Sequence, residues 1–131
     1  LTGMTRDTGP AHLARAALEA AAYQTNDLLA ASSKPPTALR VDGGMARNDW
    51  FAQFLADLLG IPVARPAVTE TTAWGAAVLA GLQCGLFPSL DDVRHAWQAA
   101  NTFTPSISDA QREKLLLGWR RAVAQVRAGV D

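Results

Sequence analysis

The stretch between residues 38 and 65 places the strongest constraint on the fold, because a strand, a helix and a second strand follow one another in it. Two short apolar runs, residues 38–41 and 61–65, are expected to form the strands. Between them, residues 48–59 carry apolar side chains at the i, i+3, i+4, i+7 spacing of an amphipathic helix. These apolar side chains are Phe51, Phe54, Leu55 and Leu58. Two strands joined by a helix are typical of a parallel crossover unit, so the pattern predicts an α/β fold with a mostly parallel sheet.

Further helices are expected on both sides of this unit. One covers residues 10–31, with an inner stripe of apolar side chains along its length, and it ends before two prolines that cannot continue a helix. A helix rich in small residues at 71–84 is expected to pack closely on the sheet or on another helix. The last two are expected from Ser89 to about residue 99 and over residues 109–127. Because sheets usually have about 4–6 strands, the missing strands are expected in a part of the protein outside this sequence.

The composition fits a single globular domain of 131 residues and excludes several classes of protein. Hydrophobic residues make up 49%, and the 12 basic and 12 acidic residues cancel, so neither disorder nor a nucleic-acid-binding surface is indicated. No apolar run reaches the roughly 18 residues of a membrane span. The single cysteine, Cys84, is expected to be a buried thiol, and the absence of disulfides predicts a cytoplasmic protein. Since the sequence starts at Leu1, it is expected to be a piece of a longer chain.

The turn Asp42-Gly43-Gly44 is where a ligand site is expected. Ligands of open α/β sheets bind beyond the carboxyl ends of strands, and glycine lets the backbone approach a base or phosphate that a Cβ would obstruct. The start of the next helix adds unpaired N–H groups, and Asn48 there has an amide that can pair with an adenine edge or a ribose hydroxyl. These features favour a nucleotide. A plain connecting turn is the alternative, because the segment matches neither the dinucleotide-binding nor the P-loop pattern.

Other polar residues are expected to be structural rather than catalytic. Asp42 is expected to cap or hold its turn, and residues 69–72 are expected to form the start of a helix. His12 and His95 lie on separate helices without a nearby cysteine, so no metal site is predicted from them. The four tryptophans are expected to pack mostly in the core.

Several runs of residues carry a resemblance to a known family. They are VDGGM at 41–45, NDW at 48–50, QFLADLLGIPV at 53–63 and RPAVTETTAWGAA at 65–77. These runs resemble the C-terminal domain of the glycerol kinases, a group within the FGGY carbohydrate kinases. The resemblance covers residues 3–85 closely and the last two helices loosely. Asp42, the run NDW at 48–50 and the threonine-rich stretch at 69–72 favour glycerol kinases over the pentose or gluconate kinases of the same family.

The resemblance implies a partial ribonuclease-H-like (actin-like ATPase) domain and a function for the full-length protein. Residues 1–131 would be part of a C-terminal nucleotide-binding domain, with residues 86–131 as peripheral helices. The full-length protein would use ATP with Mg²⁺ to phosphorylate glycerol, giving glycerol 3-phosphate, and would be a homo-oligomer. Gly44 and Asn48 would contact ATP or ADP, with Gly43 close beside them. Arg47 stands where relatives usually have a small or aliphatic residue, and it could reach a phosphate.

The resemblance also implies what this chain lacks. The catalytic aspartate, the glycerol-binding residues and most phosphate-binding turns of the family would precede Gly3, and the metal would be held mainly outside this chain. No catalytic residue and no metal ligand are therefore predicted here, and the isolated chain is expected to be inactive. Two alternatives stay open: a kinase for another polyol or sugar of the same family, and a non-catalytic α/β binding module.

Overall fold

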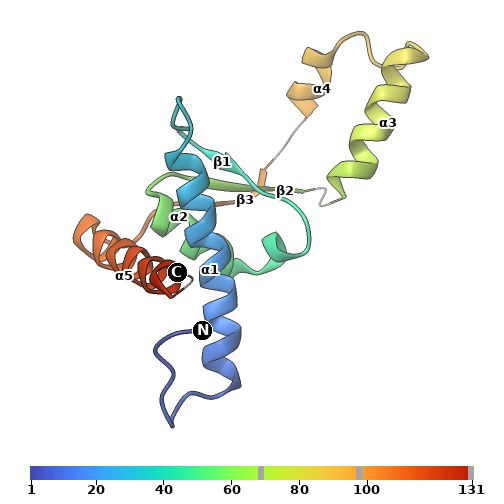
Figure 1. The fold of residues 1–131 in the computed structure, drawn as a ribbon. Helices are drawn as coiled ribbons and strands as arrows, with labels where there is room; N and C mark the ends of the chain where they lie inside the picture. Colours follow the sequence, from blue (N-terminus) through green and yellow to red (C-terminus); the bar gives the residue numbers. More distant parts are fainter. Residues whose placement is uncertain (68–69, 97–98, 130–131) are drawn as a thin grey trace.

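A computed structural model describes residues 1–67, 70–96 and 99–129. Figure 1 shows a small sheet beside α1, α2 and α5, with α3 and α4 extending away from it. The helices are α1 (Pro10–Ala30), the short 3₁₀ helix η1 (Met45–Arg47), α2 (Asp49–Leu59), α3 (Thr71–Gln83), α4 (Leu90–Ala96) and α5 (Asp109–Ala128). The strands are β1 (Leu39–Arg40), β2 (Val63–Pro66) and β3 (Ala99–Phe103). The α/β class predicted from the sequence is confirmed.

The sheet in the described part of the chain has the order β1-β2-β3 and is mixed rather than mostly parallel. β1 pairs with β2 in parallel, as the crossover through α2 requires, with Leu39 opposite Val63. β3 pairs with β2 antiparallel, with Phe103 opposite Val63. The sequence analysis missed β3 because its residues are largely exposed and show no alternation of apolar and polar side chains. The predicted fourth helix is shorter than expected and ends at Ala96, and residues 97–98 lie outside the described part.

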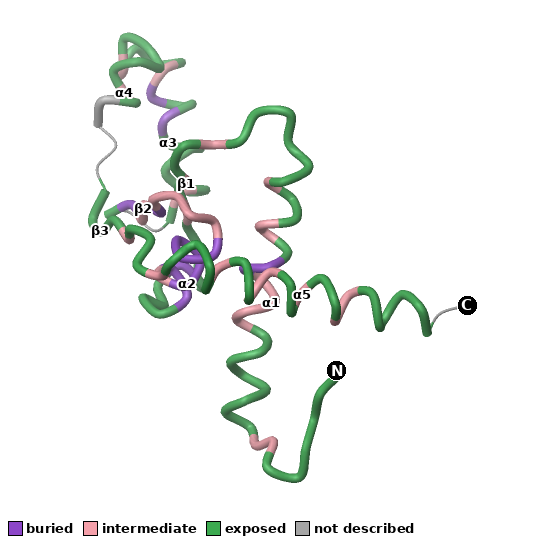
Figure 2. Tube along the Cα trace, turned by 90° about the vertical axis from the view of Figure 1, so that its left-hand side faces the viewer, coloured by how far each residue is buried: buried purple, intermediate pink, exposed green. Residues whose placement is uncertain are grey.

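The core forms around α2, as its apolar spacing predicts. The four apolar side chains of its inner face are buried, and they pack with Tyr23 of α1 and Val63 of β2. The helix contacts α1, β2, β3 and α5, and the buried residues in Figure 2 concentrate along it. Gly60 ends the helix in the left-handed conformation, with φ of 69°. α2 is therefore the central element on which the other elements pack.

Only the middle of α1 belongs to the core. Ala22 and Tyr23 are buried, and Leu18 and Ala21 pack against the core, whereas Leu28 is 72% exposed. The predicted continuous stripe is therefore wrong at both ends of the helix. The reason is geometric: a helix of 21 residues extends beyond the region where it crosses α2.

The helix α5 packs on the core through its first half. It starts with a capping box, in which the Ser108 Oγ accepts from the Gln111 N–H at 3.3 Å and the Gln111 Oε1 accepts from the Ser108 N–H at 2.9 Å. Trp119 stacks on Tyr23 with ring centroids 5.2 Å apart. Its Nε1 donates to Asp27 of α1 at 2.7 Å. Leu115 and Leu116 pack against the core together with this tryptophan, while Val126 is exposed.

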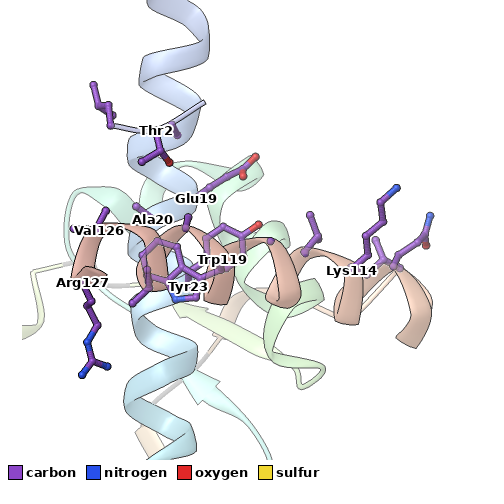
Figure 3. Close-up of a pocket in the computed structure, with 16 residues that line it drawn as sticks. Thr2, Glu19, Ala20, Tyr23, Lys114, Trp119, Val126 and Arg127 are labelled. Atoms are coloured by element: carbon purple, nitrogen blue, oxygen red, sulfur yellow. The ribbon is translucent and has the colours of Figure 1, made fainter. Parts of the chain in front are cut away.

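A mostly apolar groove of about 880 Å³ lies between α1 and α5 (Figure 3). Tyr23 and Trp119 lie at its floor, and Leu1 and Thr2 of the N-terminal segment line it as well. Burial raises the pKa of the Tyr23 hydroxyl above its ordinary value; the negative charge of Glu19 adds to this increase, and the positive charge of Arg15 opposes it.

The helix α3 does not pack in the way predicted from its small residues. It contributes no residue to the hydrophobic core cluster, and Trp74 and Leu79 are exposed. Its described aromatic contact is local, with Trp74 and Phe87 edge to face at 6.4 Å between ring centroids. Cys84 is exposed, which corrects the expectation of a buried thiol. The described part of the chain leaves most of this helix surface uncovered.

The tryptophans were expected mostly in the core, and two of them are instead exposed. Trp50 lies on the surface of α2, where it stacks on Phe54 at 5.2 Å between ring centroids. The guanidinium of Arg15 lies 5.2 Å from the centroid of the same Trp50 ring. Trp74 is exposed on α3, and Trp97 lies outside the described residues.

A substitution in α2 tests the assignment of the core. Leu55 is 2% exposed, whereas Leu79 on α3 is 67% exposed. We expect Leu55→Ala to lower the free energy of unfolding by about 2–5 kcal/mol, because it removes buried methyl groups and leaves a cavity. The control Leu79→Ala should change it by less than about 0.5 kcal/mol. Urea denaturation of the 131-residue chain measures both values, and equal effects would contradict this core.

Candidate functional site

The glycine turn, residues 42–48, joins the end of β1 to the start of α2. Gly43 has φ of +84°, a left-handed conformation that is strained for residues with a side chain. Gly44 has an ordinary φ of −60°, so the backbone does not require glycine there. A Cβ added to either glycine would meet no atom within 4 Å in the described structure. The surface over Gly44 is therefore open, and a ligand could approach the backbone closely.

Asn48 begins α2 and uses only part of its amide to do so. Its Oδ1 accepts a hydrogen bond from the Phe51 N–H at 3.2 Å, the bond expected of an N-cap residue. The side chain is exposed at the edge of the glycine turn. Because the cap uses one of the two lone pairs of the amide oxygen, the NH₂, which can only donate, is the larger part of the amide left for a ligand. The cap geometry thus favours donation from Asn48 toward a ring nitrogen or an oxygen.

Arg65 of β2 holds the glycine turn in place through hydrogen bonds. Local sequence patterns did not predict this role. Its Nη1 donates to the Ala46 carbonyl at 2.9 Å and to Asp49 Oδ1 at 2.7 Å. Its Nη2 donates to Asn101 Oδ1 of β3 at 3.0 Å. The side chain is only 14% exposed, so these partners compensate its loss of hydration. A charged residue inside an apolar strand was the sequence signal that could have indicated such partners.

The start of α3 is linked to the glycine turn by two polar contacts. The Thr71 hydroxyl donates to Asp42 Oδ2, and Arg47 Nη2 lies 3.2 Å from Glu70 Oε1. Asp42 therefore holds the turn, as predicted. Glu70 and Thr71 begin α3, as expected, although Glu70 makes no side-chain cap, and both side chains contact the turn in addition. Thr69 lies outside the described residues.

The described residues also bear on other kinds of site. Among them, no group of three or more His, Cys, Asp or Glu side chains could hold a metal ion. His12 has a structural contact, since its Nδ1 accepts from the Gly9 N–H at 3.1 Å. None of the helices in the described ranges is both long and apolar enough to cross a membrane. The groove between α1 and α5 is lined by none of the glycine-turn residues, so the two features are separate.

Comparison with known proteins shows relatives that share this architecture. Residues 1–84 match the model of the FGGY family of carbohydrate kinases, C-terminal domain. A glycerol kinase from Alteromonas mediterranea is 49% identical over 130 residues, which are 97% of this chain and 26% of that protein. A glycerol kinase from Rhodospirillum centenum is 54% identical over 132 residues, with 98% of this chain and 26% of that protein covered. The chain thus spans about a quarter of the length of these curated relatives.

Solved structures show the same likeness in three dimensions. The crystal structure of Plasmodium falciparum glycerol kinase with ADP matches with a TM-score of 0.80 and 34% identity, over 94% of this chain and 26% of that one. A xylulose kinase from Rhodospirillum rubrum matches with a TM-score of 0.75 and 25% identity, over 97% of this chain and 27% of that one. The family match extends over more than half of the residues and includes the glycine turn. The chain belongs to the FGGY family of carbohydrate kinases, and its residues 1–84 match the C-terminal domain of that family.

Proposed function

We propose that this chain is the nucleotide-side part of an ATP-dependent glycerol kinase. The parent protein would transfer the γ-phosphoryl group of ATP to glycerol and release glycerol 3-phosphate. The observation that carries the proposal is the open surface over Gly44 beside Asn48, in a chain that is similar to a glycerol kinase crystallised with ADP. Identities of 49% and 54% to glycerol kinases, against 25% to a xylulose kinase structure, favour glycerol as the acceptor.

The glycine turn would bind the adenosine part of the nucleotide. With no Cβ at Gly43 or Gly44, a base or ribose can lie directly against the backbone. The NH₂ of Asn48 would donate to an acceptor atom of the nucleotide, while its oxygen continues to cap α2. Arg65 would keep the turn in place, because it bonds to Ala46 and Asp49 on either side of Asn48. These residues bind and orient the nucleotide and do not take part in the chemical step.

Phosphoryl transfer needs further groups that would come from the rest of the parent. A residue that positions the glycerol hydroxyl, the phosphate-binding groups and the Mg²⁺ ligands complete such a site. The metal would neutralise charge on the transferred phosphoryl group, and the described residues contain no cluster suited to hold it. The parent would act in the cytoplasm as a homo-oligomer. The domain assignment of residues 1–131, with residues 86–131 peripheral, is part of the same proposal.

An assay of the full-length parent tests the proposal directly. We expect ATP-dependent formation of glycerol 3-phosphate, with a kcat/KM for glycerol at least about 100-fold above that for xylulose, which is about 2.7 kcal/mol of discrimination. The 131-residue chain alone should form no product under the same conditions. A parent that phosphorylates xylulose but not glycerol would show that the acceptor is wrong. Turnover by the chain alone would show that the missing groups are not required.

Substitution of Gly44 in the parent tests the position of the nucleotide. We expect Gly44→Val to raise the KM for ATP by roughly tenfold or more, since a side chain forced into a packed contact costs about 1–3 kcal/mol. The melting temperature and the KM for glycerol should stay unchanged, because a Cβ there meets no protein atom within 4 Å. Gly118→Ala, another glycine with open space at Cβ, is the matched control. An unchanged KM for ATP would remove Gly44 from the site.

Asn48→Asp separates the ligand contact from the helix cap. Aspartate keeps an oxygen that can cap α2, but it replaces the donating NH₂ with an acceptor. We expect the KM for ATP to rise about tenfold or more, because loss of one partner leaves the nucleotide acceptor unsatisfied at a cost of about 1–3 kcal/mol. Thermal denaturation should show a stability close to that of the unsubstituted parent. A lower melting temperature with an unchanged KM would assign Asn48 to the cap alone.

A further inference from the structure

We infer that Asp42, Arg47, Glu70 and Thr71 are positioning residues for the nucleotide, because they fasten the glycine turn to the start of α3. This inference rests on the proposed function and adds four residues to Gly43, Gly44 and Asn48. We refer to the two contacts, Asp42–Thr71 and Arg47–Glu70, as the turn latch.

The turn latch holds the glycine turn on both sides of its two glycines. Asp42 directly precedes Gly43, and Arg47 is the last residue of η1, which follows Gly44. Their partners, Glu70 and Thr71, are consecutive at the N-terminal end of α3. A shift of the turn relative to α3 would therefore break at least one of the two contacts.

The position of α3 makes these contacts important. The hydrophobic core cluster consists of residues from α1, α2 and β2, with parts of β1, β3 and α5 packed against it, and it contains no residue of α3. Two side-chain hydrogen bonds, Thr71 to Asp42 and Arg47 to Glu70, join the start of α3 to the glycine turn. Polar contacts rather than apolar burial thus relate the turn to this helix.

Both latch contacts lie at the exposed surface. Each can therefore affect the position of the glycine turn while contributing little to the stability of the fold. The side chains of Arg47 and Glu70 are 62% and 78% exposed, and such surface pairs contribute little to folding. A binding site, however, loses affinity when the groups that contact the ligand are less well preorganised. Loss of one latch contact is therefore expected to weaken nucleotide binding while the fold stays intact.

Charge exchange in the full-length parent tests the Arg47–Glu70 contact. We expect Arg47→Glu and Glu70→Arg each to raise the KM for ATP about three- to fivefold, which is about 0.6–1 kcal/mol and lies at the upper end of what exposed ion pairs contribute. The value of kcat, the KM for glycerol and the melting temperature should stay within experimental error. The double variant, with both charges exchanged, should restore the KM for ATP, which a purely local role of either residue would not produce.

Two substitutions of Thr71 test the Asp42–Thr71 contact. Thr71→Val keeps the shape of the side chain and removes the hydroxyl, so we expect a similar rise in the KM for ATP. Thr71→Ser keeps the donor to Asp42 and should bind ATP as the parent does. Equal values of the KM for ATP in the valine and serine variants would overturn the role of this contact.

Two further results would overturn the turn latch as a whole. Unchanged KM values for ATP in all single variants would show that the contacts do not position the nucleotide. An Arg47→Glu defect that the Glu70→Arg exchange does not restore would show that Arg47 acts on the nucleotide itself.

Hydrogen exchange of the nucleotide-free parent distinguishes failure of the latch from failure of the proposed function. If the latch exists, the backbone amides of residues 43–48 should exchange faster in Arg47→Glu and Thr71→Val, and at the original rate in the charge-exchanged double variant. This readout needs no catalytic activity. A parent without glycerol kinase activity but with these exchange rates would reject the proposed function and keep the latch. Unchanged exchange rates in an active parent would reject the latch and keep the function.

Discussion

Four apolar side chains on one face of α2 are buried against α1, β2, β3 and α5, and this burial fixes where the glycine turn lies. Removing apolar surface from water is the main favourable contribution to folding, and α2 buries most of the large side chains in the described core. Because α2 begins at Asp49, its placement also sets the position of Asn48 and the η1 turn before it. The candidate site is therefore a consequence of how this one helix packs.

Polar contacts then fix the details that apolar packing leaves open. Arg65 joins β2 to the η1 turn, to the first turn of α2 and to β3, so one side chain connects the sheet with the candidate site. A largely desolvated guanidinium is costly without partners, and here Nη1 and Nη2 both donate to oxygens. The Gly43 conformation and these contacts together define the shape of the turn, while the surface over Gly44 stays open.

Local patterns predicted the elements around the turn well, because those elements depend on their own residues. The apolar spacing in α2 is such a local signal, and the structure confirms the helix that it predicts, which ends before Gly60. The strand β3 could not be predicted in this way, since its residues are exposed and its conformation is stabilised by pairing with β2. Helix spacing likewise could not indicate how much of α1 and α3 is covered, because coverage depends on distant elements.

In the candidate site, too, local features could be predicted from the sequence, whereas contacts between distant residues could not. The two glycines and Asn48 could be identified as a site from the sequence, because a strand, a glycine pair and a helix start follow one another along the chain. The contacts of Arg65, Glu70 and Thr71 with the turn could not, since they join residues that are between 16 and 29 positions apart. Long-range polar partners of this kind depend on the tertiary arrangement and leave little trace in local spacing.

A crystal structure of the full-length parent with ADP tests the central claim most directly. The account predicts that the adenosine part of ADP lies against the backbone at Gly44, within hydrogen-bond distance of the Asn48 NH₂. It also predicts that Arg65 keeps its bonds to Ala46 and Asp49 in that complex. ADP bound with its adenosine away from residues 43–48 would contradict the account.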